Sequence, residues 1–114
     1  MTLLKGLQIA ACVGTIAVGV VSLFWPLRVQ GFTGLEANGG RGITEIRVIL
    51  GALFIGLGML PLILGTPETY QMLGYTYLLI GVVRVFTMFI DQSVMQSNVI
   101  SVISEIVFGV ILVL

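Results

Sequence analysis

The sequence contains no histidine and only one cysteine, Cys12, among its 114 residues. Without histidine the chain lacks the most common ligand of haem iron and zinc and the usual general base near neutral pH. A single cysteine excludes an internal disulfide and a cysteine-ligated cluster. Within an apolar segment Cys12 is expected to serve as a small packing residue. We therefore expect neither a metal nor another cofactor.

Charge is also scarce. Charged residues make up 9% of the chain and hydrophobic residues 58%, and the mean hydropathy is +1.18. A typical soluble domain carries roughly 25% charged residues, and a small domain cannot hide so much apolar surface from water. The five cations are balanced by five anions and form no basic run, which argues against nucleic acid as a partner. The composition predicts that the lipid bilayer is the solvent.

The hydrophobic pattern predicts one domain, 1–114, that is an all-α bundle of four transmembrane helices. Their expected ranges are about 3–25, 44–65, 70–90 and 97–114. The first uncharged run, 6–27, is about 33 Å long as a helix, enough to cross a hydrocarbon core of about 30 Å. A cleaved signal peptide is the alternative, but the run is long for that purpose and ends in bulky residues. We expect a retained helix.

The breaks between these helices fix the expected topology. Residues 26–43 form the longest loop, and Thr44 is the expected N-cap of the second helix. Pro61 is expected to kink that helix. Four spans place both termini on one side of the membrane. Three of the five cations lie on the opposite side, so the first and third loops are expected to be cytoplasmic.

Small residues mark the faces expected to pack. In lipid, helices associate where small side chains let their backbones approach closely. Such residues recur at helical spacing in all four expected spans, and the candidates are Ala10, Gly14, Ala52, Gly56, Gly74, Gly81 and Gly109. We expect these positions to lie at helix interfaces.

Two charged residues lie well inside the expected helices. Arg84 precedes Asp91 by seven residues, and Glu105 follows Asn98 by seven, so each should lie roughly 10 Å below the third loop. An antiparallel hairpin would bring them to equal depth. Each alone in lipid would cost at least about 2.5 kcal/mol. The sequence therefore predicts that Arg84 and Glu105 pair.

Three further charges are candidates for the same polar cluster. Asp91 shares a helical stripe with Arg84. Glu45 and Arg47 enter from the same side on the second helix but point about 200° apart, and Arg47 is the better candidate for the interior because it lines up with Gly51. Glu45 could instead complement the helix N-terminus. The cluster could be a structural ion-pair network, or a site for an anionic headgroup, a substrate or a proton.

The run from Arg41 to Arg47, followed by Gly51, resembles the DUF4345 family of small four-helix bacterial membrane proteins of unassigned function. Further marks of the resemblance are Gly81 and Arg84 leading to Asp91, and Glu105 in the last helix. The family often has a glycine pair where this chain has Gly51-Ala52. The resemblance implies a multi-pass protein of the bacterial cytoplasmic membrane and draws attention to Glu45, Arg47, Arg84, Asp91 and Glu105. It implies no activity.

Two functions are compatible with these features. The first is a non-catalytic accessory or assembly subunit that contacts other membrane-protein subunits or itself. The alternative is a small homo-oligomeric transporter, or a protein that binds a lipid or small molecule at an intramembrane Arg–Glu site. An enzyme is the third choice, because no nucleophile or metal set accompanies the charges.

Overall fold

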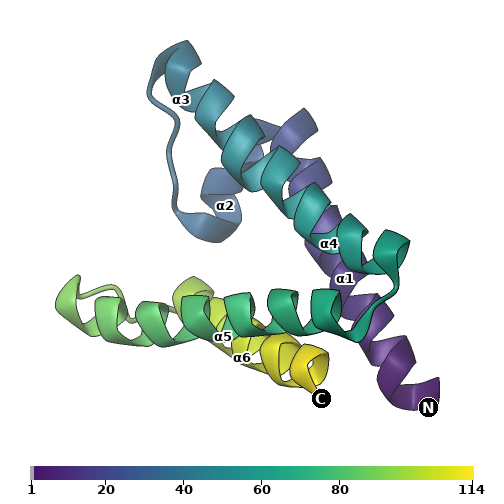
Figure 1. Ribbon diagram of the computed structural model, residues 1–114. Coiled ribbons are helices and arrows are strands. Elements are labelled where there is room, and N and C mark those ends of the chain that lie inside the picture. The colour runs from purple at the N-terminus through teal and green to yellow at the C-terminus, as the bar shows by residue number, and fades with distance from the viewer. Residues whose placement is uncertain (1) are drawn as a thin grey trace.

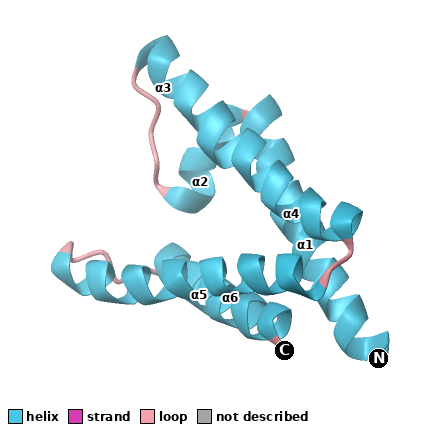
Figure 2. Ribbon diagram, in the orientation of Figure 1, coloured by secondary structure: helices cyan, strands magenta, loops and turns pink. Residues whose placement is uncertain are grey.

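The computed structural model describes residues 2–114, and this part of the chain is helical without a strand (Figure 2). Four helical segments are long and apolar enough to cross a membrane: Leu3–Phe24, Gly39–Leu64, Pro67–Ile90 and Gln96–Val113. The predicted fold class, an all-α membrane protein with four transmembrane helices, is confirmed.

The first span is helix α1, Thr2–Phe24. It ends there because Pro26 has no N–H group and disfavours helical geometry at Trp25, whose φ and ψ are −131° and 63°. A single 3₁₀ turn, η1 (Pro26–Arg28), and a short helix, α2 (Val29–Thr33), follow. The expected long loop is therefore partly helical.

The second span is one continuous helix made of α3 (Gly39–Glu45), the π-helical segment η2 (Ile46–Ala52) and α4 (Leu53–Leu64). It begins at Gly39, so Thr44 lies inside the helix and the expectation that it is the N-cap is wrong. An ion pair between Arg41 and Glu45, one turn apart, supports the added turn. The helix continues through Pro61.

The third and fourth spans are α5 (Pro67–Ile90) and α6 (Gln96–Val113). Gly65 ends α4 in the left-handed conformation with φ 68°, and Pro67 occupies the first turn of α5, so only two residues separate the helices. At the other end of α5, Ser93 N–H donates to the carbonyl of Met88. This bond reverses the chain toward α6.

The four spans form two antiparallel hairpins, one from α1 and the α3–α4 helix, the other from α5 and α6 (Figure 1). The hairpins meet near the end that holds both termini and diverge toward the loops at the opposite end. The buried core lies where they meet and consists of Ala11, Cys12, Tyr70, Leu73 and Leu112. Cys12 is fully buried. On the side of the first and third loops, residues from all four spans line a cleft between the hairpins.

Candidate functional site

A glycine stripe joins α1 to the second span. A Cβ on Gly58 would stand 2.6 Å from the Cys12 carbonyl oxygen, and one on Gly19 would stand 2.7 Å from the Gly51 carbonyl oxygen. Distances this short mean that the two backbones touch directly. The contact face of the second span is therefore built on Gly51 and Gly58, seven residues apart.

Three sequence-predicted packing positions do not lie at this interface. Ala10 and Ala52 are exposed, and a Cβ on Gly56 would meet nothing within 4 Å. The correction has a geometric reason. With Gly51 and Gly58 turned toward α1, Ala52 is rotated about 100° away from the contact. On α1 the buried face passes through Ala11 and Thr15, and Ala10 lies beside it.

The other predicted small residues do lie between helices. In the α5–α6 hairpin, a Cβ on Gly74 would stand 3.0 Å from the Gly109 carbonyl oxygen, and one on Gly109 would stand 3.1 Å from the Gly74 carbonyl oxygen. A Cβ on Gly81 would stand 2.8 Å from Cδ1 of Ile106. Gly14 contacts the Phe108 ring across the two hairpins. Close backbone approach thus fixes the register of α5 against α6.

That register brings Arg84 of α5 to Glu105 of α6. Arg84 Nε donates to Glu105 Oε1 at 2.9 Å and to Oε2 at 3.1 Å, and Nη2 donates to Oε2 at 2.7 Å. The Arg84 side chain is 32% exposed and that of Glu105 is 11% exposed. A planar guanidinium binding both carboxylate oxygens is a strong and directional ion pair. The pair has no net charge.

Asn98, at the start of α6, completes the cluster. Its Oδ1 accepts a hydrogen bond of 3.0 Å from Arg84 Nη1, and its Nδ2 donates to the backbone carbonyl of Ser93 at 2.9 Å. Sequence reasoning missed this residue because an asparagine near a turn is ordinarily assigned to the turn itself. The available signal was its position in the first turn of α6, seven residues before Glu105 and therefore on the same face of the helix.

The remaining predicted charges stand apart from this cluster. Asp91 is exposed at the C-terminal end of α5. Glu45 pairs with Arg41 on the outside of α3, and Arg47 is exposed. The expectation that Arg47 points into the bundle is wrong because Ile46 holds the buried position beside it. A buried apolar side chain needs no partner in the interior, whereas a buried arginine would.

A cleft of about 580 Å³ opens between the hairpins, and the Arg84–Glu105 pair lies on its wall. All four spans contribute to the lining, and Gly31, Phe32 and Thr33 of the α2 region close its loop end. The polar part of the wall comes from Arg84, Ser97, Ser101, Ser104 and Glu105, and the apolar part from residues that include Val18, Leu50, Phe54, Ile100 and Phe108. The cleft is thus amphipathic.

Tyr77 closes the base of this cleft. Its hydroxyl lies 2.5 Å from Thr15 Oγ1 of α1, and its ring packs edge-on against Phe108 of α6 with centroids 5.6 Å apart. Neither Tyr77 nor Thr15 is among the site residues predicted from the sequence. A tyrosine in mid-helix, far from both interfaces, was the signal that its hydroxyl needs a buried partner.

Chemically, the arrangement can recognise polar groups but offers little for bond-breaking. Each carboxylate oxygen of Glu105 accepts a hydrogen bond from Arg84. The positive charge of the guanidinium therefore balances the negative charge of the carboxylate. Among residues 2–114 no three histidine, cysteine, aspartate or glutamate side chains come together in a way that could hold a metal ion. Comparison with protein-family models, curated proteins and solved structures finds no match to this chain.

Proposed function

We propose that this small multi-pass membrane protein is a non-catalytic binding protein that holds an amphipathic molecule in the cleft between its hairpins. The observation that carries the proposal is the Arg84–Glu105 pair on the wall of an open cleft of about 580 Å³. Binding sites for small molecules commonly measure about 300–1,000 Å³ and combine an apolar lining with a few convergent polar groups. The cleft has both properties.

The lining also indicates the kind of ligand. The ion pair is neutral overall, and the hydroxyl groups of Ser97, Ser101 and Ser104 on α6 lie beside it. A zwitterionic or uncharged polar headgroup suits this wall better than a bare anion or cation, because it needs no counter-charge. Phe54 and Phe108 provide contact for an acyl or aromatic portion. A lipid or a lipid-like compound is the class that meets both conditions.

The test uses lysophosphatidylcholine, a single-chain zwitterionic lipid, as the probe. Ser104 is exposed on the cleft wall, so Ser104→Trp should fill the cleft without disturbing the helix interface. Ile103 lies next to it, exposed and outside the cleft lining, and Ile103→Trp is the matched control. We expect the Ser104 variant to retain at least tenfold less probe in native mass spectrometry. Equal retention by both variants would refute binding in the cleft.

An accessory or assembly subunit of a larger membrane complex is the second candidate. It is favoured by the partial exposure of Arg84, which is 32% exposed on the wall of the cleft; a polar side chain on a partner helix that enters the cleft could cover it. Purification from the native membrane in a mild detergent separates the candidates. Stoichiometric co-migration with a larger assembly, lost in Ser104→Trp, supports the subunit. A particle containing only this chain and lipid supports the binding protein.

Membership of the DUF4345 family and residence in the bacterial cytoplasmic membrane are part of the same proposal. They rest on the sequence resemblance from Arg41 to Glu105. Orientation can be tested with the buried Cys12 replaced by serine and a new cysteine placed at Ala37, in the first loop. We expect labelling of Ala37→Cys by a membrane-impermeant maleimide only after the cytoplasmic face is opened.

A further inference from the structure

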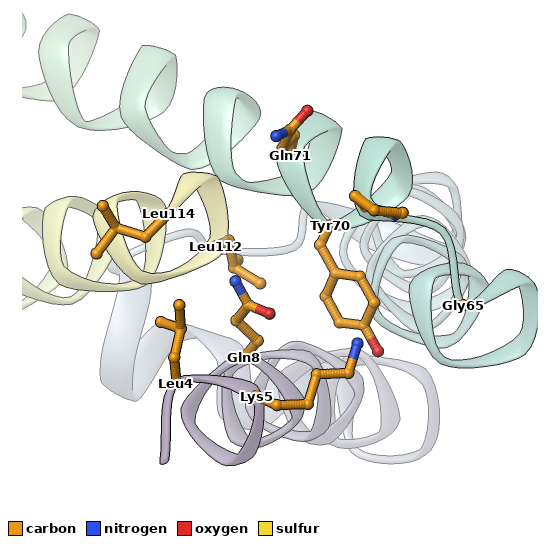
Figure 3. A pocket seen from close by; sticks show the side chains of 9 residues that line it. Leu4, Lys5, Gln8, Gly65, Tyr70, Gln71, Leu112 and Leu114 are labelled. Carbon is orange, nitrogen blue, oxygen red and sulfur yellow. The ribbon is translucent and has the colours of Figure 1, made fainter. Parts of the chain in front are cut away.

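A second cavity lies at the opposite end of the molecule, where the two termini are. It measures about 310 Å³ and is formed by the start of α1, the α4–α5 turn, the start of α5 and the end of α6 (Figure 3). Its lining residues are Leu4, Lys5, Gln8, Gly65, Pro67, Tyr70, Gln71, Leu112 and Leu114. Because these are the ends of spans, we expect the cavity at the level of the lipid headgroups.

Lys5 supplies the positive charge of this cavity. Its Nζ lies 3.9 Å from the centroid of the Tyr70 ring, and Figure 3 shows the ammonium group held at that ring inside the cavity. The ring positions the ammonium by a cation–π contact but accepts no strong hydrogen bond. In residues 2–114 no carboxylate lies within 4.0 Å of Lys5. Its charge is therefore available to an anion.

The surroundings of Lys5 favour a lipid anion over a free one. An apolar wall at the same cavity is formed by Leu4, Leu112 and Leu114. Gln8 also lines the cavity, and its Nε2 donates a hydrogen bond of 3.1 Å to the carbonyl oxygen of Ile111. Figure 3 shows α1 contributing Leu4, Lys5 and Gln8, while Leu112 and Leu114 come from α6 and the C-terminal end that follows it. An acyl-glycerol group can cover that wall while a phosphate reaches the ammonium.

The α5 helix adds a weaker attraction. Pro67 opens this 24-residue helix beside the cavity, and the positive end of a helix dipole favours anions within its first turn. Glu68 in that turn already uses part of this field. The dipole thus supplements Lys5, and removal of the Glu68 charge should strengthen anion binding.

We propose that this cavity binds the phosphate of an anionic phospholipid, with Lys5 as the cationic contact. The site goes beyond the proposed function, because it has a different charge, lies at the other membrane face and shares no lining residue with the cleft. Occupied, it would fix the terminal face of the bundle to the headgroup layer.

The test measures the thermal unfolding midpoint of the purified chain in detergent with added phosphatidylglycerol or phosphatidylcholine. We expect phosphatidylglycerol to raise the midpoint more, and Lys5→Gln to remove that difference and to weaken phosphatidylglycerol binding about fivefold. Lys5→Arg should preserve the preference, and Glu68→Gln should increase it. The control is Arg28→Gln, which removes an exposed cation outside this cavity.

Two results would overturn the proposal. In the first, Lys5→Gln keeps the preference for phosphatidylglycerol. In the second, inorganic phosphate alone stabilises the chain as much as phosphatidylglycerol does, which would leave the apolar wall without a role. The Ser104→Trp variant should leave the lipid preference intact, so failure of the cleft and failure of this site give different results.

Discussion

Tyr77 of α5 donates its hydroxyl proton to Thr15 Oγ1 of α1, across a distance of 2.5 Å. The direction follows from a second bond, in which Thr15 Oγ1 donates its own proton to the Ala11 carbonyl oxygen at 2.8 Å. This contact joins the two hairpins at the base of the cleft, and it joins them through side chains alone. The two hairpins are therefore joined by a polar contact beside the apolar core formed by Ala11, Cys12, Tyr70, Leu73 and Leu112.

The direction of that bond makes Thr15→Val and Tyr77→Phe unequal. Tyr77→Phe leaves Thr15 bonded to Ala11, so we expect a loss of about 0.6–1 kcal/mol. Thr15→Val keeps the shape but leaves the partly buried Tyr77 hydroxyl without its acceptor, and should cost about 1–3 kcal/mol. Denaturation in mixed micelles measures both. A smaller loss for Thr15→Val would mean that Tyr77 is not the donor.

The Arg84–Glu105 pair predicts a strongly non-additive double variant. Arg84→Ala leaves the carboxylate of Glu105, 11% exposed, without its partner, and should cost about 3–5 kcal/mol. Arg84→Ala combined with Glu105→Ala should cost less than the single change, since no charge is stranded. Unfolding of the two singles and the double completes the cycle. Simple additivity would show that the residues do not interact.

Asn98 and Asp91 test the corrected membership of the cluster. Asn98→Ala removes the acceptor of Arg84 Nη1 and the bond to Ser93, and we expect a loss of about 1–2 kcal/mol. Asp91→Asn removes an exposed charge at the end of α5 and should change stability by less than about 0.5 kcal/mol. The same unfolding assay compares them. Equal losses of stability in the two variants would indicate that Asp91 belongs to the cluster after all.

Two glycines of α4, only two residues apart, should respond in opposite ways to alanine. Gly58→Ala places a methyl group 2.6 Å from the Cys12 carbonyl oxygen, which forces α1 and α4 apart at a cost of about 1–3 kcal/mol. Gly56→Ala meets nothing within 4 Å and should be neutral or stabilising by up to about 1 kcal/mol, through helix propensity. Thermal unfolding midpoints of both variants decide the matter, and a destabilised Gly56 variant would contradict this packing.

The small residues show which helix interfaces the spacing in the sequence predicts and which it does not. Spacing alone indicated that Gly74, Gly81 and Gly109 lie on the faces of α5 and α6, and the structure puts them between those helices. The same reasoning selected Ala52 and Gly56 in the second span, where Gly51 and Gly58 make the contact. A stripe of small residues repeats on several faces of a glycine-rich helix, and spacing does not say which face the neighbour occupies.

The sequence by itself determined the solvent and the number of spans, because it holds four runs that are long and apolar enough to cross a membrane, and the last two carry only Arg84 and Glu105 in their interior. It also placed Arg84 and Glu105 at one depth, since helical rise and a short turn fix depth along an antiparallel hairpin. Only the tertiary structure decided that Arg47 and Asp91 stay outside, that Asn98 joins the pair, and that the hairpins diverge around a cleft. Those outcomes depend on the rotation of each helix about its axis and on the angle between hairpins. Both are set by side-chain contacts between residues far apart in the chain, which local periodicity does not encode.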